Sequence, residues 1–279
     1  MRKFLRWLSG LAPVRVLIRW LGLAPLVRKA YHHVAASDGI FRAEVAGIPI
    51  MLHANSGRDL IWFEGAVVTD RDWSEKKALE AMVAFLKPGD VAFDVGANLG
   101  LYSVTLAKRV GEQGRVFSFE PRRSTFQNLQ ANVQLNELKN VVCFQKALGE
   151  QAASLPIYTF PEEPWCSSLL GGQEKVLGKT PGVETVEVEV GDAFRRAHDL
   201  PVPRAIKIDV EGFEYAVMRG LAETLGDARC QFVGCEVHPH LLPSGITLQK
   251  VMDLLRSFGF SRINVSPCGL DQKIDCYKV

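Results

Sequence analysis

The sequence lacks a long hydrophobic run, a paired-cysteine motif and a large net charge. No apolar stretch approaches the roughly 20 residues that cross a bilayer, so we predict no membrane-spanning helix. None of its six cysteines forms a Cys-x-x-Cys pair, which argues against a zinc site or a disulfide framework and indicates reduced thiols in a cytoplasmic protein. A formal net charge of +2 is far from the basic balance of dedicated nucleic-acid-binding domains, so no nucleic-acid partner is expected.

The Gly-x-Gly-x-x-Gly fingerprint of dinucleotide-binding folds is also absent. The chain instead has the spacing Asp-x-Gly-x-Asn-x-Gly over residues 94–100, between an apolar run and a helical pattern. Strand, turn and helix in this order are typical of α/β sheets that hold a cofactor at the carboxyl ends of their strands. Gly96 and Gly100 would let the backbone approach a ligand, and Asp94 can accept hydrogen bonds from an ammonium group. A tight turn without any ligand is the alternative.

Residues 1–36 differ in composition from the rest, because basic and apolar residues alternate there and the first acid is Asp38. Arg15 and Arg19 interrupt any stretch that could serve as the core of a secretory signal. The pattern is typical of a basic amphipathic segment on an anionic membrane surface, here the inner one, or on a partner. An ordinary helix packed on the main domain is an equal alternative.

Predicted strands and helices alternate from residue 85 onward, which indicates a parallel sheet with helices on both faces. We divide the chain into an amino-terminal extension over 1–74, with short strands at 40–45 and 48–52, and a domain over 75–279. Within that domain, residues 150–190 predict a hairpin insertion whose loop lies near a substrate. Strands of the sheet are predicted at 91–95, 115–121, 141–145 (running on into 146–149), 205–208, 231–239, 260–265 and 275–279. Helices are predicted at 75–86, 101–110, 124–135, 213–225 and 248–258.

Acidic side chains follow several of these strands. Glu120 ends the second strand, 20 residues after Gly100. A carboxylate at that place can accept hydrogen bonds from both hydroxyls of a ribose. Asp209, Glu211, Glu236 and His238 come from the carboxyl ends of two later strands, which are adjacent and would bring them together. The alternative for some of them is a structural role, such as an ion pair with Lys207.

Four segments together resemble the FkbM family of class I S-adenosylmethionine-dependent methyltransferases. The resemblance covers about residues 75–240 and rests on the order and spacing of segments 93–102, 119–121, 206–214 and 236–238. It implies a Rossmann-like sheet of seven mostly parallel strands, the last one antiparallel. It also implies O-methylation of a hydroxyl on a sugar, a glycan or a polyketide-type natural product.

The resemblance further implies roles for individual residues. S-Adenosylmethionine would be held at its methionine end by Asp94, Gly96, Asn98 and Gly100, at its ribose by Glu120, and near its adenine by Lys146 and Ala147. The catalytic residues that would face the methyl group and the acceptor are Asp209, Glu211, Glu236 and His238.

An alcohol is a poor nucleophile until its proton is removed, so this reaction needs a general base or a metal. His238 is a good base by its intrinsic pKa. The same cluster could hold Mg²⁺ or Ca²⁺, but no metal motif is complete, so we favour a direct base and expect no metal. Glu214 lies inside a predicted helix and is assigned a structural role. A nucleotide-dependent oxidoreductase and a non-catalytic methyltransferase-like binding module remain open as other functions.

Overall fold

The computed structural model describes residues 38–55, 57–68, 75–160, 167–172, 174 and 177–278. The predicted membrane-contact segment over residues 1–36 lies outside this set, so that prediction stands as it was made. Among the helices that are described, none combines the length and the apolar character needed to cross a bilayer.

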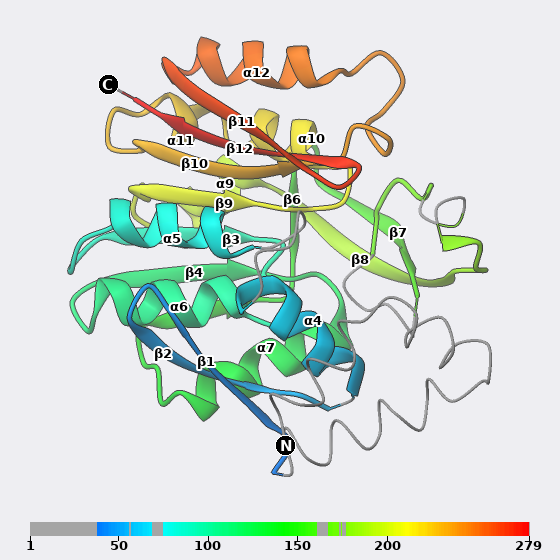
Figure 1. Ribbon diagram of the computed structural model, residues 1–279. Helices are drawn as coiled ribbons and strands as arrows, with labels where there is room; N and C mark the ends of the chain where they lie inside the picture. The colour runs from blue at the N-terminus through cyan, green and yellow to red at the C-terminus, as the bar shows by residue number, and fades with distance from the viewer. Residues whose placement is uncertain are drawn as a thin grey trace.

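A seven-stranded sheet forms the centre of the molecule, in the order β11-β12-β10-β9-β3-β4-β5 (Figure 1). Strand β12 pairs antiparallel with both of its neighbours, and the pairs among the other strands are parallel. The predicted Rossmann-like, mostly parallel sheet is therefore confirmed. Its strands are β3 (Val91–Val95), β4 (Arg115–Phe119), β5 (Val141–Phe144), β9 (Ala205–Ile208), β10 (Phe232–Val237), β11 (Arg262–Cys268) and β12 (Asp271–Tyr277).

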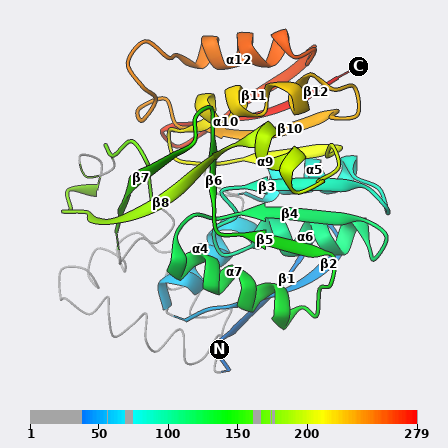
Figure 2. The same ribbon diagram turned by 180° about the vertical axis from the view of Figure 1, so that it is seen from behind.

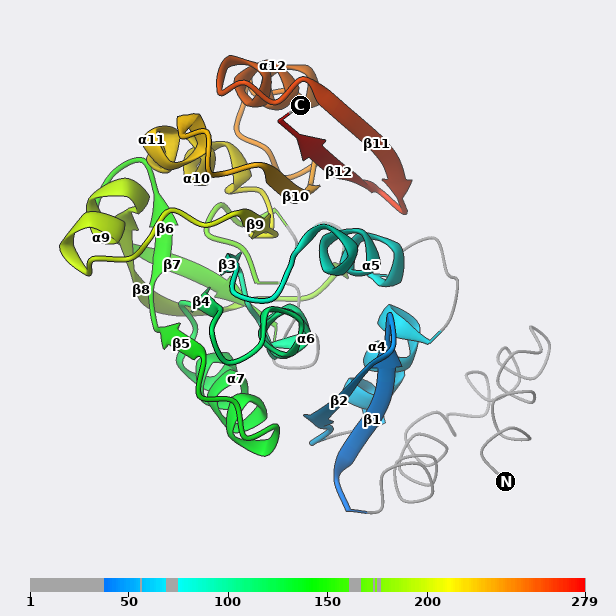
Figure 3. The same cartoon turned by 90° about the vertical axis from the view of Figure 1, so that its left-hand side faces the viewer.

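Helices cover both faces of this sheet, as predicted (Figure 3). The side chains of β3 alternate between the two cores: Ala92 belongs to one, and Phe93 and Val95 belong to the other. One face packs against α5 (Lys76–Phe85) and α6 (Leu101–Val110), with α7 (Arg123–Leu135) beside α6. The other face packs against α9 (Gly191–Ala197), α10 (Glu214–Gly220), α11 (Ala222–Gly226) and α12 (Leu248–Ser257).

The two predicted amino-terminal strands are confirmed as the antiparallel hairpin β1 (Ile40–Val45) and β2 (Ile48–His53). Ala46 and Gly47 both have positive φ, 49° and 79°, which matches the right-handed twist of a two-residue hairpin. The hairpin and the following helix α4 (Gly57–Val67) pack outside α6 and α7. The backbone of β2 is hydrogen-bonded to a side chain of α7: the His53 N–H donates to Asn132 Oδ1 at 2.6 Å.

Two elements are arranged differently from the sequence prediction. The third strand does not run to residue 149. It ends at Phe144, and β6 (Ala147–Gly149) joins a second sheet of order β6-β8-β7 with β7 (Ala153–Thr159) and β8 (Gly182–Val190). The predicted single helix over 213–225 is divided into α10 and α11. At the end of α10, Gly220 lies so close to β6 that an added Cβ would stand 1.8 Å from the Gly149 carbonyl oxygen.

The hairpin predicted within 150–190 is present as β7 and β8, which pair antiparallel beside the main sheet (Figure 2). Its loop falls partly outside the described residues. The last two strands of the main sheet begin and end at other residues than predicted, because β11 and β12 form a tight hairpin that turns at Gly269 and Leu270.

Candidate active site

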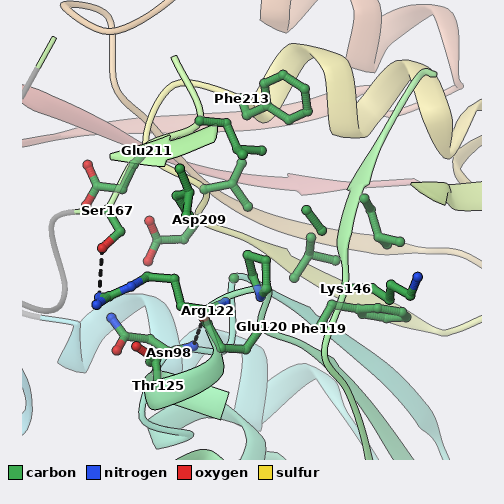
Figure 4. Close-up of a pocket in the computed structure, with 18 residues that line it drawn as sticks. Asn98, Phe119, Glu120, Arg122, Thr125, Lys146, Ser167, Asp209, Glu211 and Phe213 are labelled. Atoms are coloured by element: carbon green, nitrogen blue, oxygen red, sulfur yellow. Dashed lines mark hydrogen bonds between the residues drawn. The ribbon is translucent and has the colours of Figure 1, made fainter. Parts of the chain in front are cut away.

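A pocket of about 640 Å³, open to solvent, lies at the carboxyl ends of β3, β4 and β9 (Figure 4). This is the edge at which the sequence predicted a ligand. Five of the predicted cofactor residues line it, and two of the predicted catalytic residues line its other end. These seven residues are Gly96, Asn98, Glu120, Lys146, Ala147, Asp209 and Glu211.

The two glycines of the turn after β3 serve different contacts. Gly96, with φ of 78°, lies against the chain that leaves β9, because an added Cβ would stand 1.8 Å from the Asp209 carbonyl oxygen. Gly100, with φ of 88°, precedes α6 and faces α7, where an added Cβ would stand 2.7 Å from Leu129 Cδ1. Gly96 therefore lets two turns meet at the pocket, and Gly100 lets two helices pack.

Glu120 is held in place by the backbone on both sides. Its Oε2 accepts a hydrogen bond from the Asn98 N–H and its Oε1 accepts one from the Arg122 N–H, both at 3.0 Å. Burial raises the pKa of Glu120 to about 7, against the opposing effect of these two donors. The pocket thus contains a fixed carboxyl group that changes its charge near neutral pH.

Asp94 lies behind the pocket rather than in its lining. It is fully buried, and its Oδ2 accepts a hydrogen bond from Ser103 Oγ at 2.6 Å. Lys207 Nζ lies 3.5 Å from Asp94 Oδ1 and 3.4 Å from Asp209 Oδ2, and donates to the Gly96 carbonyl at 2.6 Å. Burial alone would lower the pKa of Lys207, but Asp209 and Asp94 outweigh it and raise that pKa. Lys207 therefore joins the two turns that form the pocket.

Four side chains form a cluster at the end of β9 and β10. His238 Nδ1 lies 2.7 Å from Glu214 Oε1, and His238 Nε2 lies 3.4 Å from Glu211 Oε2 and 3.9 Å from Asp209 Oδ1. His238 is 4% exposed and stands behind the two carboxylates that line the pocket. We call Asp209, Glu211, Glu214 and His238 the histidine cluster.

The groups in the histidine cluster shift each other's pKa values. Burial alone would lower the pKa of His238, but the carboxylates of Glu211, Glu214 and Asp209 raise it well above its ordinary value. Burial raises the pKa of Glu211 to about 8, and Asp209 adds to this while His238 opposes it. For Asp209 the effect of burial is outweighed by Lys207 and His238, so its pKa is lowered. The protonation of His238 is therefore linked to that of the carboxyl groups around it.

Glu214 is the member of this cluster that sequence reasoning did not select. It is fully buried, and its Oε1 also accepts a hydrogen bond from the Gly212 N–H at 2.8 Å. The available signal was its place in the first turn of a helix directly after an Asp-x-Glu-Gly turn. Glu214 connects that turn to His238.

Glu236 faces a second, smaller cavity of about 310 Å³, which shares Asp209 with the main pocket. Lys273 Nζ lies 2.8 Å from Glu75 Oε1 and 3.6 Å from Glu236 Oε2. Burial raises the pKa of Glu236 well above its ordinary value, with Glu75 and Asp209 adding to the effect. The structure thus brings Asp209, Glu211 and His238 together and places Glu236 on the far side of Asp209.

The β7–β8 insertion contacts both ends of the pocket. Arg122 Nη1 donates to Ser167 Oγ at 2.9 Å (Figure 4), and Lys146 Nζ lies 2.8 Å from Glu189 Oε1 on β8. Next to Ser167, Ser168 Oγ donates to the Glu211 carbonyl at 2.6 Å. These contacts went unrecognised in the sequence because the serines lie in a segment without a motif.

A sequence comparison identifies the family. The family model described as the methyltransferase FkbM domain matches residues 94–262, which is more than half of the chain. The chain belongs to the FkbM methyltransferase family. The matched FkbM segment contains every predicted site residue from Asp94 to His238, while the β1–β2 hairpin and α4 lie outside it.

Three curated relatives are similar to this FkbM chain over part of its length. Methyltransferase 1 of Beauveria bassiana is 29% identical over 142 residues, which are 46% of this chain and 57% of the relative. Hexuronic acid methyltransferase AglP of Haloferax volcanii is 27% identical over 62% of this chain and 66% of its own length. The 31-O-demethyl-FK506 methyltransferase FkbM of Streptomyces tacrolimicus is 30% identical, with 63% of this chain and 74% of the relative covered. The chain thus spans less than two thirds of the first two relatives.

Proposed function

We propose that this chain transfers a methyl group from S-adenosylmethionine to a hydroxyl oxygen of a sugar, glycan or natural-product acceptor. One observation carries the proposal: a single pocket has the anchored carboxyl of Glu120 toward one end and the carboxylates of Asp209 and Glu211 at the other. The names of two relatives, a hexuronic acid methyltransferase and a 31-O-demethyl-FK506 methyltransferase, support this range of acceptors.

The residues of the pocket fit the proposed cofactor. Glu120 presents a carboxyl to ribose hydroxyls, and Lys146 and Ala147 line the wall where the adenine would lie. Asn98 Oδ1 is buried and has no hydrogen-bond partner among the described residues, so it can still accept one from a ligand. The bound cofactor would supply a methyl group on a positively charged sulfur.

Two predicted cofactor residues act from behind the pocket in this proposal. Asp94 holds Lys207, and Lys207 in turn holds the Gly96 carbonyl, so the turn is rigid before any ligand arrives. Gly100 permits the packing of α6 on α7, which directs the amino end of α6 beside the turn. Positioning of this kind supplies much of the rate of a displacement reaction.

Methyl transfer to a hydroxyl also requires removal of the hydroxyl proton, and we assign this step to the histidine cluster. Asp209 and Glu211 face the pocket, whereas His238 is buried behind them. Asp209 has a lowered pKa and Glu211 a pKa raised to about 8, so in the cluster without a cation Asp209 is the ionised group that would accept the proton. Glu236 lines the second cavity, which Asp209 also reaches, and is the member of the predicted catalytic set farthest from this role.

The test is calorimetric titration of the full chain with S-adenosylmethionine, followed by incubation with candidate acceptors and mass analysis for an added methyl group. Micromolar binding and methylation of a hydroxyl are expected. A folded chain that binds no S-adenosylmethionine overturns the proposal, and binding of a nicotinamide dinucleotide in its place would favour an oxidoreductase. Cofactor binding without methylation of any sugar or macrolide acceptor would favour a binding module.

We also propose peripheral membrane contact of a cytoplasmic protein through residues 1–36, supported by their basic and apolar composition. The full chain should co-sediment with vesicles that contain an anionic phospholipid and not with neutral vesicles, and added salt should weaken the binding. Equal sedimentation with both kinds of vesicle would contradict this part of the proposal.

A further inference from the structure

Three potential ligand atoms of the histidine cluster converge at the pocket. One carboxylate oxygen each from Asp209 and Glu211 and a ring nitrogen of His238 all lie within 4.8 Å of one another. Asp209 and Glu211 follow β9, and His238 follows the neighbouring strand β10, so two rigid strands determine their separation. Both carboxylates line the pocket in which the acceptor would meet the cofactor.

The orientation of His238 is fixed by a residue outside this group of three. Glu214, fully buried, engages Nδ1 at 2.7 Å and leaves Nε2 directed at Asp209 and Glu211. The second oxygen of Glu214 has no hydrogen-bond partner among the described residues. A buried carboxylate on the outer nitrogen of a histidine is the usual support of a metal-binding imidazole, because it fixes the tautomer and increases the basicity of the other nitrogen.

The distances at Nε2 suit a shared cation better than direct hydrogen bonds. The two carboxylate oxygens stand 3.4 and 3.9 Å from Nε2, whereas charge-assisted hydrogen bonds measure about 2.7–2.9 Å. In an octahedral site with ligand bonds of about 2.1 Å, adjacent ligand atoms are about 3 Å apart and opposite ones about 4.2 Å. The observed separations of 3.4 and 3.9 Å lie between these two values, so each would have to change by roughly 0.3–0.4 Å for a cation to bind.

The charge around His238 also favours a cation. Besides the cluster's three carboxylates, Asp271 forms a second possible ligand group with His238 and Glu236. The two buried lysines nearby are already engaged: Lys207 with Asp94 and Asp209, and Lys273 with Glu75 and Glu236. Even if His238 is counted as a cation beside these two lysines, the carboxyl groups of Asp209, Glu211, Glu214, Glu236 and Asp271 outnumber the basic groups among the described residues, and a bound cation would stabilise their ionised forms.

We propose that Asp209, Glu211 and His238 bind one divalent cation at the acceptor end of the pocket. Two carboxylate oxygens and one imidazole nitrogen suit Mn²⁺, with Mg²⁺ as a weaker competitor. We choose this group over Glu236, His238 and Asp271 because its carboxylates line the pocket. Its role rests on the proposed function: a bound cation would lower the pKa of the acceptor hydroxyl, whose proton would then leave to water at the open mouth of the pocket. This differs from the sequence expectation of a direct base, since ligands from two strands form no motif along the chain.

The probe is Mn²⁺ alone, titrated into the full chain without cofactor or acceptor and followed by electron paramagnetic resonance of the free ion. One saturable site per chain is expected, with nitrogen coupling from one imidazole in the bound state. Glu211→Gln, which removes a ligand charge, should abolish saturation. Glu214→Gln, which removes the charge behind His238 but none of the three ligands, should weaken binding about 10–100-fold. Asp253→Asn, an exposed carboxylate on α12, is the matched control and should leave binding unchanged.

Absence of saturable binding to the wild-type chain would overturn the proposal, and so would equal affinity in the Glu211→Gln variant. Each variant is also titrated with S-adenosylhomocysteine, which checks that its pocket is folded. A wild-type chain that binds S-adenosylhomocysteine but no Mn²⁺ excludes the cation site and leaves the proposed function intact. A wild-type chain that binds Mn²⁺, loses this binding in the Glu211→Gln variant and does not bind S-adenosylhomocysteine would support the cation site and exclude the proposed function.

Discussion

Glu120 should make cofactor affinity depend on pH. Its pKa in the ligand-free pocket is raised to about 7 by burial, so the carboxyl is mostly neutral at pH 6 and mostly ionised at pH 8. Ribose hydroxyls donate hydrogen bonds to the ionised carboxylate of Glu120, so at low pH the ligand binds only after Glu120 has lost its proton. The ionised fraction rises from about 0.1 at pH 6 to about 0.9 at pH 8, which corresponds to about tenfold tighter binding, or ~1.4 kcal/mol.

The assay is calorimetric titration with S-adenosylhomocysteine at several pH values between 6 and 8. This ligand has the same ribose and adenine and removes the sulfonium charge from the comparison. The matched variant is Glu120→Gln, which keeps the size of the side chain but cannot titrate. It should bind more weakly at every pH, because its amide NH₂ would face a backbone N–H that Glu120 now accepts, and its affinity should not change with pH. An equal tenfold rise in the variant, or wild-type affinity that falls with pH, would refute the reasoning.

Three further predictions concern the free energy of unfolding, measured in urea. Gly96→Ala should lower the free energy of unfolding by more than ~3 kcal/mol, because Gly96 has a positive φ and the added Cβ would meet a carbonyl oxygen. Gly245→Ala, where φ is also positive but the space is open, should lower it clearly less. Lys207→Met should cost about 3–5 kcal/mol by leaving buried carboxylates uncompensated, whereas the exposed Lys139→Met should be nearly neutral. Asn132→Ala should lower the free energy of unfolding by about 1–3 kcal/mol, because it removes the hydrogen-bond acceptor of the His53 backbone N–H on β2. Similar unfolding midpoints within either matched pair, or an unchanged one for Asn132→Ala, would contradict these arguments.

Local features of the fold were predictable from the residues. The turn at Ala46 and Gly47 and the strand–turn–helix over 91–110 appear where they were expected, because hydrophobic periodicity and glycine conformation act within a few residues. The number of strands and the antiparallel last strand came from the resemblance to the FkbM family, and the order of the strands came from the tertiary structure. The errors fall where a distant segment intervenes: β6 joins the second sheet, and Gly220 meets the Gly149 backbone where one helix had been predicted.

The candidate site shows the same division. The sequence by itself determined which polar residues end the strands, and hence that Glu120, Asp209, Glu211 and His238 would lie at one edge of the sheet. Only the tertiary structure decided which of them face the pocket. His238 and Glu214 are 24 positions apart, and Lys207 and Gly96 are 111 apart, so their contacts depend on how strands pair. Their pKa shifts depend on this packing too, because charges strongly perturb one another only after the folded chain has removed water from between them.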